Sequence, residues 1–264
     1  MQIVETKALS RSFGMLKAVD DLNVAVAEGE VFGLLGPNGA GKTTTIKMLN
    51  TLLPPTSGEA KVDGHDIVTE SREVRKVIGY VPQMLSAEGS LTAYENLLIF
   101  AKIYGLPKAG RYEKILEALR FMGLEEAKDR QVRTFSGGMI RRLEIAQSTL
   151  HSPKLLFLDE PTVGLDPGAR HAVWDMIGRL REDAGTTVFL TTHLMEEADV
   201  LCDRVGIMHR GKLVALGSPE ELKAGIGAKD LDEVFIHYAG EGGDLTGGNY
   251  REVDRMRKTA RRLG

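Results

Sequence analysis

The chain has 264 residues, 42% of them hydrophobic and 27% charged, which supports one or two domains and excludes a disordered chain. A formal net charge of −3 gives no reason to expect a nucleic-acid partner, and the single cysteine, Cys202, excludes an intramolecular disulfide framework. No stretch approaches the ~20 apolar residues needed to cross a bilayer and no apolar signal-peptide core opens the chain, so we expect a soluble, cytosolic protein with one main domain.

In the first third of the chain, short β-like runs alternate with amphipathic helical stretches. This alternation is typical of an α/β fold around a largely parallel sheet. The helix is predicted from apolar residues at helical spacing, and two prolines then stop it. The predicted elements are, in order, a buried strand over residues 30–35, a helix from Thr43 to Pro54-Pro55, a hairpin over residues 59–68 turning at Asp63-Gly64, and a strand over residues 77–81.

The strand signal disappears between about residues 85 and 150, where apolar residues recur at helical spacing in three segments. We interpret this stretch as a helical subdomain inserted into the α/β core. The alternation resumes afterwards, and Ser218 and Glu221 have capping-box spacing. The predicted elements are helices around residues 94–104, 112–122 and 139–150, a strand over 155–158, a helix over 172–180, strands over 187–191, 204–208 and 212–215, a short helix from about 218, and a glycine-rich linker over 240–248.

The strongest local motif is Gly36-Pro37-Asn38-Gly39-Ala40-Gly41-Lys42-Thr43, which matches G-x-x-x-x-G-K-[ST] between a predicted strand and a predicted helix. Its glycines allow consecutive backbone N–H groups to form an anion-binding nest at a helix N-terminus. Lys42 is expected to reach the β- and γ-phosphates, Thr43 to ligate Mg²⁺ and Thr44 to add a phosphate contact. Taken alone, the segment also fits a structural tight turn, and it does not separate kinases, GTPases, helicases and transport ATPases.

Two carboxylates, Asp159 and Glu160, follow a buried apolar run, at the strand end where ligands of open α/β sheets bind. Asp159 is placed to hold Mg²⁺, and Glu160 to orient or deprotonate an attacking water. Two acids at a strand end also fit a chain that simply leaves the core. Gln83 and His193 follow two other predicted strands, and each alone fits a structural residue as well as a functional one.

The segment Phe135-Ser136-Gly137-Gly138-Met139 begins a helical run about twenty residues before the two acids. By itself, Ser136 would be an ordinary helix cap. Together with the motifs above, and in this order, it makes the chain resemble the ATP-binding subunit of an ABC transporter over about residues 1 to 222. The resemblance implies a P-loop NTPase core with a mostly parallel sheet, an antiparallel β subdomain and an inserted helical subdomain at about 85–150, followed by a C-terminal extension over 223–264.

The resemblance also implies a role for each motif. The implied nucleotide contacts are Phe13, which stacks on adenine, the Walker A loop Gly36 to Thr43 with Thr44, the signature Ser136-Gly137-Gly138, and Asp166 of the D-loop Gly164-Leu165-Asp166. The implied catalytic residues are Glu160, the switch His193, Gln83 of the Q-loop and Lys42. The implied magnesium ligands are Thr43, Gln83 and Asp159.

In the ABC family two ATPase subunits pair head to tail, with each ATP between one Walker A loop and the partner's signature. The resemblance therefore implies ATP and Mg²⁺, a second ATPase subunit (a copy or a paralogue), an integral-membrane permease on a separate chain, and a place on the cytoplasmic face of the cell membrane. Phe135 and Met139 depart from the commonest signature, L-S-G-G-Q. Both S-G-G-M and the segment Leu231–His237 resemble the exporter branch typified by daunorubicin-resistance ATPase subunits, so we expect ATP hydrolysis that powers export.

Two other classes of function stay open. An ABC ATPase without a permease acts in translation or DNA repair, but such relatives usually carry two nucleotide domains or a long coiled-coil insertion. This chain has one such domain, and only about fifty residues separate Gln83 from Ser136. A P-loop kinase or GTPase would leave Ser136-Gly137-Gly138 unexplained.

The C-terminal segment over residues 251–264 contains six basic and two acidic residues. Val253, Met256, Ala260 and Leu263 fall at helical spacing within it. One hypothesis is a helix that lies on anionic headgroups or on the permease, and the other is a solvated tail.

Overall fold

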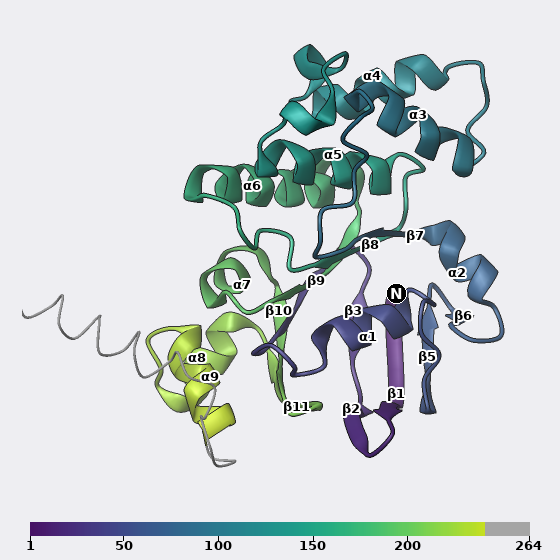
Figure 1. Cartoon of the computed structure of the whole chain (residues 1–264). Coiled ribbons are helices and arrows are strands. Elements are labelled where there is room, and N and C mark those ends of the chain that lie inside the picture. The colour runs from purple at the N-terminus through teal and green to yellow at the C-terminus, as the bar shows by residue number, and fades with distance from the viewer. Residues whose placement is uncertain (241–264) are drawn as a thin grey trace, which may run out of the picture.

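Two β-sheets organise residues 1–240, which are the residues that the computed structural model describes (Figure 1). The six-stranded sheet has the order β11 (Lys212–Gly217), β10 (Arg204–His209), β4 (Val31–Leu35), β9 (Thr187–Thr192), β8 (Leu155–Asp159), β7 (Ile78–Val81), and only the β10–β11 pair is antiparallel. The five-stranded antiparallel sheet has the order β2 (Leu16–Leu22), β1 (Gln2–Phe13), β5 (Ser57–Val62), β6 (His65–Asp66), with β3 (Ala25–Ala27) on β1. The predicted α/β class is confirmed.

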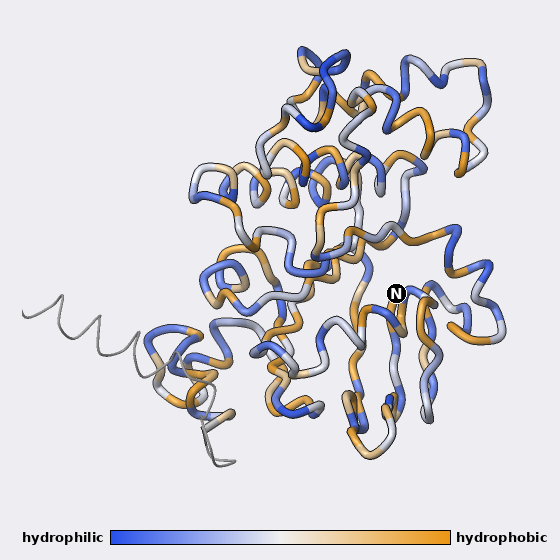
Figure 2. The backbone as a smooth tube through the Cα atoms, viewed as in Figure 1, coloured by the Kyte–Doolittle hydropathy of each residue, from blue (hydrophilic) through white to orange (hydrophobic). Residues whose placement is uncertain are grey.

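Hydrophobic residues on the two faces of the parallel sheet belong to two separate cores, because successive side chains of a strand point to opposite faces. On β8, Leu155 and Phe157 pack toward the antiparallel sheet, whereas Leu156 and Leu158 pack toward the helices. Figure 2 shows the hydrophobic residues concentrated along these central strands. A parallel sheet covered on both faces is rigid and leaves its strand ends free to carry a site.

The predicted helical subdomain is confirmed and stands apart from the antiparallel sheet in Figure 1. Its helices are α3 (Ala93–Ile103), α4 (Arg111–Phe121) and α5 (Gly137–Thr149), with two 3₁₀ turns at Glu125–Ala127 and Val132–Thr134. Thr92 caps α3 in a capping box with Glu95, and Ser136 caps α5 by accepting from the Met139 amide. The signature segment therefore ends in a helix N-terminus.

The remaining helices cover the sheet or connect its strands. They are α1 (Lys42–Leu49), α2 (Ser71–Val77), α6 (Pro167–Ala184), α7 (Met195–Leu201), α8 (Pro219–Ile226) and α9 (Leu231–Gly240). The capping box of Ser218 and Glu221 starts α8 as predicted. The predicted hairpin also forms, and both residues of its Asp63-Gly64 turn have positive φ, as a two-residue hairpin loop requires.

Sequence patterns placed several elements wrongly. The helix expected from Thr43 to Pro54 ends at Leu49, because Asn50 closes it and Thr51 takes a positive φ of 66°. Strands β1, β2 and β3 and helices α2, α7 and α9 were not predicted. The burial pattern of β1 alternates irregularly, since register shifts interrupt its pairing with β2, and this hides the period of two that marks a strand.

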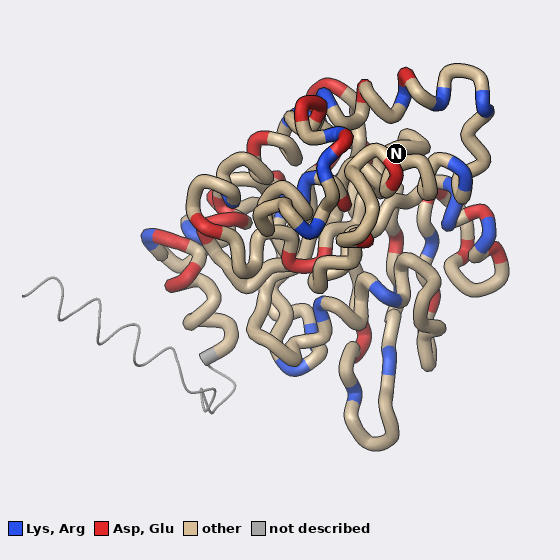
Figure 3. The backbone as a smooth tube through the Cα atoms, turned by 45° about the horizontal axis from the view of Figure 1, so that its top comes forward, with Lys and Arg blue, Asp and Glu red and all other residues tan. Residues whose placement is uncertain are grey.

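Charged residues of both signs are interspersed along the described part of the chain (Figure 3). Within residues 1–240, none of the helices combines the length and apolar character needed to cross a membrane. The linker expected over 240–248 and the basic segment over 251–264 lie outside the described residues, apart from Gly240, which ends α9.

Candidate nucleotide-binding site

The glycine-rich loop joins the end of β4 to the start of α1. All three of its glycines, Gly36, Gly39 and Gly41, have positive φ. A Cβ at Gly36 would collide with the carbonyl oxygen of Met208, and one at Gly41 with that of Ala18. The loop is thus held between β10 and β2. Its last residues lead into the first turn of α1, where backbone N–H groups have no intrahelical acceptors and are free to bind an anion.

Lys42 is the first residue of α1, and its side chain reaches back to the start of the loop. Its ammonium donates to the carbonyl oxygens of Gly36 at 2.7 Å and Pro37 at 3.2 Å, and it lies 3.2 Å from Oε1 of Glu160. Both charged side chains are about 95% buried, since 4% of the Lys42 side chain and 5% of that of Glu160 are exposed. A buried cation next to the anion nest is placed to bind phosphate by exchanging its carboxylate partner for a phosphoryl oxygen.

Glu160 brings together the four residues predicted to be catalytic. Its Oε2 accepts from Nε2 of Gln83 at 3.2 Å and lies 3.1 Å from Nδ1 of His193, while Oε1 faces Lys42. Glu160 itself has a positive φ of 50°, and its amide donates to both the carbonyl oxygen and the hydroxyl of Thr191. This unusual conformation turns the carboxylate from the end of β8 toward the loop.

Asp159 precedes Glu160 at the end of β8 and contacts two hydroxyls. Its Oδ1 accepts from Thr43 at 3.0 Å and from Thr191 at 2.6 Å. The neighbouring Tyr80 is half-buried, and this burial, together with the charge of Asp159, raises the pKa of Tyr80 to about 12. The Thr43 hydroxyl and the Asp159 carboxylate are in contact here, and Gln83 lines the same pocket as Thr43. Hydroxyl, carboxylate and amide oxygens are ligands of the kind that Mg²⁺ takes alongside water and phosphate.

A pocket of about 480 Å³ extends from these side chains to the turn between β1 and β2. Phe13 and Leu16 line its far end, the loop from Asn38 to Thr44 lines its floor, and Gln83 and Glu160 complete it. Phe13 is 47% exposed, so one face of its ring is available to a ligand. An apolar end joined to a phosphate-binding loop matches the two parts of a nucleotide.

Gly36 and Pro37 do not line this pocket but hold Lys42 through their carbonyl oxygens, and the remaining predicted nucleotide contacts also lie outside it. Ser136 and Gly137 are exposed at the N-terminus of α5, and Asp166 is exposed at the N-terminus of α6, where it caps the helix by accepting from Ala169. A Cβ at Gly138 would collide with Ala169, so the signature is packed against the start of α6. The N-termini of α5 and α6 therefore lie next to each other, and neither lines the pocket that contains the phosphate loop.

The sequence patterns missed three side chains that support the site. Thr191 on β9 holds both Asp159 and the Glu160 amide. Arg141 on α5 is 2% exposed and donates to the carbonyl oxygens of Pro82 and Gln83, and its partner Glu144 accepts from Ser86. Burial lowers the pKa of Arg141. The helix that begins at the signature therefore fixes the backbone around Gln83.

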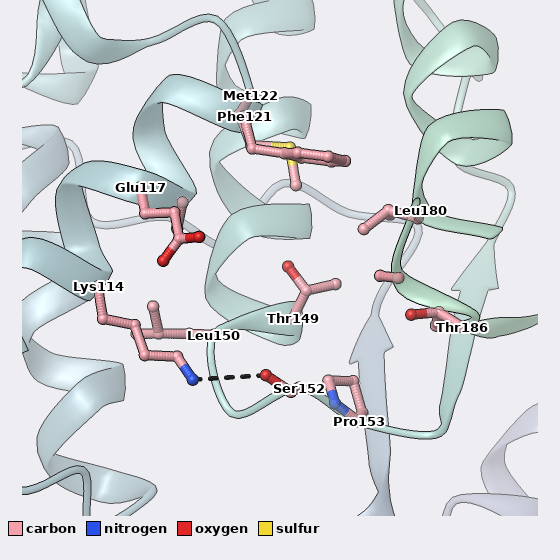
Figure 4. Close-up of a pocket in the computed structure, with 12 residues that line it drawn as sticks. Lys114, Glu117, Phe121, Met122, Thr149, Leu150, Ser152, Pro153, Leu180 and Thr186 are labelled. Carbon is pink, nitrogen blue, oxygen red and sulfur yellow. Dashed lines mark hydrogen bonds between the residues drawn. The ribbon is translucent and has the colours of Figure 1, made fainter. Parts of the chain in front are cut away.

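A second pocket of about 320 Å³ lies between α4, the end of α5 and the end of α6 (Figure 4). Lys114 and Glu117 line it from α4, and Lys114 donates to Ser152 at 3.4 Å across its lower edge. None of the predicted site residues lines this pocket. The nucleotide pocket is therefore the one that carries the site chemistry.

The fold and the site define a P-loop ATPase: a phosphate loop between a parallel strand and a helix, faced by two acids at the end of a second strand. The family model described as "ABC transporter" matches residues 19–163. The chain belongs to this family and is an ATP-binding subunit that hydrolyses ATP. This assignment excludes the kinase, GTPase, translation and DNA-repair alternatives.

Relatives and solved structures agree with the assignment. The chain is 46% identical over 228 residues to the daunorubicin/doxorubicin resistance ATP-binding protein DrrA of Streptomyces peucetius, covering 86% of this chain and 69% of the relative. It is 42% identical to the Nod factor export ATP-binding protein I of Cupriavidus metallidurans, covering 88% and 77%. Its fold is similar, with a TM-score of 0.73 and 27% identity, to the dimeric post-hydrolysis structure of the ATP-binding cassette MJ0796 bound to ADP and Pi, covering 81% and 98%.

Proposed function

We propose that the chain is the ATPase subunit of an exporter, and that the convergence of Lys42, Gln83 and His193 on Glu160 is its hydrolytic centre. This convergence, with every contact at 3.2 Å or less, is the observation that carries the proposal. ATP is expected to lie in the pocket with its base on Phe13 and its phosphates on the loop residues 38–44. Thr43, Asp159 and Gln83 would hold a Mg²⁺ ion, which would supply positive charge against the phosphates.

In this proposal Glu160 is the general base. A carboxylate held by three neighbours within hydrogen-bonding distance is fixed in direction and is placed to accept a proton from water. When a phosphate oxygen replaces Glu160 as the partner of the Lys42 ammonium, Oε1 of Glu160 becomes free to accept a proton from that water. His193 and Gln83 retain their contacts with the other oxygen and orient the carboxylate.

The active site is completed by a second subunit, either a copy of this chain or a paralogue. Ser136, Gly137 and Asp166 are exposed at two helix N-termini, outside the pocket of their own chain. A helix N-terminus with a serine cap and exposed glycines suits a γ-phosphate presented by another molecule. ATP would then join the two subunits, and hydrolysis would separate them.

We propose that residues 1–222 form the ATPase domain and residues 223–264 a C-terminal extension, with the boundary inside α8. Within this extension, α9 packs on the core through Leu231, Val234 and Phe235, which are at most 3% exposed. The helical subdomain at about 85–150 carries the signature. Because the named relatives serve drug resistance and export, we propose that the subunit works at the cytoplasmic face of the membrane.

Exposed apolar side chains that directly follow Gln83, together with others on α3, are the proposed contact with an integral-membrane permease. Met84 and Leu85 are 82% and 48% exposed, and Ile99 and Ile103, one helical turn apart on α3, are 43% and 70% exposed. Large apolar side chains exposed on a surface indicate an interaction site. Because Arg141 holds the backbone of Gln83, a partner bound there is mechanically connected to the ATP site.

We expect the tagged subunit to co-purify from solubilised membranes with one integral-membrane protein, identified by mass spectrometry. Ile103→Glu should reduce the captured amount several-fold, because a charged side chain placed in an apolar interface weakens the affinity. Val68→Glu changes a residue that is 54% exposed between β6 and α2, outside the proposed contact, and is the matched control. Capture of ribosomes or DNA, with no membrane protein, would contradict the exporter proposal.

We expect His193→Ala to lower the ATP turnover number by roughly tenfold or more while leaving ATP affinity nearly unchanged. His193 contacts Glu160 and does not line the phosphate loop, so it orients the base without holding the substrate. Steady-state ATPase kinetics measure both quantities. His65→Ala, which removes a partly exposed histidine paired with Glu70, is the control. A wild-type turnover number for His193→Ala would make His193 a structural residue.

A further inference from the structure

Arg11 stacks against the aromatic ring that the proposed function places under the nucleotide base. Its guanidinium carbon lies 4.8 Å from the centre of the Phe13 ring. The two residues are separated by one position on β1, so their side chains leave the same face of the strand. Phe13 lines the nucleotide pocket and Arg11 does not, and from this we infer that the guanidinium covers the ring face that is turned away from the pocket.

The guanidinium of Arg11 is fixed by the chain that follows the phosphate-binding helix. Its Nη1 donates to the carbonyl oxygen of Pro54 at 2.8 Å. Two further contacts join the same segments: Thr56 donates its amide to the Ser10 carbonyl at 2.8 Å, and the Ser12 amide donates to the Thr56 hydroxyl at 3.1 Å. The end of β1 is therefore attached to the segment after α1, which begins in the phosphate loop.

We propose that Arg11 is a positioning residue for base binding, which orients and polarises the Phe13 ring so that a purine stacks on its free face. This proposal rests on the proposed function, which assigns the base to Phe13. A cation on one face of a ring draws electron density toward itself. The opposite face then carries less negative charge and repels the electron-rich face of a purine less. The bond to Pro54 holds the ring at a set distance from the phosphate loop.

Calorimetric titration of ADP and of inorganic pyrophosphate tests the proposal, since neither ligand is hydrolysed and only ADP carries a base. We expect Arg11→Ala to weaken ADP binding about threefold to fivefold and to leave pyrophosphate binding unchanged. Arg11→Lys keeps the charge but lacks the planar group, so it should give an intermediate loss. Lys7→Ala removes a basic residue from the same strand and should change neither affinity.

The Phe13→Ala variant separates failure of this proposal from failure of the proposed function. If Phe13→Ala weakens ADP binding and Arg11→Ala does not, Arg11 has no role in base binding. If Arg11→Ala weakens pyrophosphate as much as ADP, Arg11 supports the loop and the proposal is wrong. If Phe13→Ala leaves ADP binding unchanged, the base lies elsewhere and both assignments fail. Within the proposal, Arg11→Ala has no further effect on ADP once Phe13 is removed.

Discussion

Glu160→Gln should bind ATP and hydrolyse it about 10² to 10⁴ times more slowly than the wild type. The amide keeps the shape of the carboxylate and still accepts from Gln83 or His193, but it does not take a proton from water. The substitution also removes the negative charge that pairs with Lys42. The ammonium can then bind phosphate without first breaking a buried ion pair. We therefore expect an ATP affinity at least equal to that of the wild type, together with an ATP-dependent dimer that accumulates because hydrolysis no longer dissolves it.

Single-turnover ATPase assays and sedimentation velocity with and without ATP measure these two effects. Glu196→Gln, which alters a side chain that is 69% exposed on α7, is the matched control and should behave as the wild type. Wild-type turnover in Glu160→Gln would contradict the assignment of Glu160 as the base. A slow enzyme that stays monomeric with ATP would keep that assignment and contradict the role of the dimer.

The phosphate loop and the two acids were predictable because each depends on chemistry that few residue types supply. Positive φ at Gly36, Gly39 and Gly41 requires glycine, and the buried strand before Asp159 is continuously apolar. The spacing of the loop residues and the position of the acids at a strand end are therefore enough to predict this part of the site from the sequence. Gln83 and His193 were ambiguous from local patterns alone, since their importance depends on the contact with Glu160 that only the folded sheet creates.

Other parts of the site and fold depend on long-range contacts that local patterns do not encode. Arg141 looks like one exposed charge among several on α5, yet it is 2% exposed because the backbone of Pro82 and Gln83 folds over it. Thr191 looks like an ordinary strand residue until β9 pairs with β8. The N-terminal strands were missed for a similar reason: β1 pairs with three different strands and carries register shifts.

Lys42→Ala should lose most nucleotide binding, and of the variants considered it should have the largest effect on affinity. The Lys42 ammonium is the one cation of the phosphate loop. It is already buried, and its hydrogen bonds to the carbonyl oxygens of Gly36 and Pro37 hold it beside the backbone N–H groups that bind the anion. Loss of such a charge-assisted contact to phosphate weakens binding by about 10- to 100-fold or more. Equilibrium binding of a fluorescent ATP analogue measures the effect.

This substitution also leaves Glu160 buried without its cation, which destabilises the fold by about 3–5 kcal/mol when one partner of a buried pair is removed. Urea unfolding must therefore accompany the binding assay. The Lys42→Ala/Glu160→Gln double variant removes both charges, so it should recover stability but not nucleotide affinity. Lys47→Ala, on the exposed face of the same helix, should change neither quantity. Nucleotide affinity restored in the double variant would mean that Lys42 serves only to neutralise Glu160 and makes no contact with phosphate.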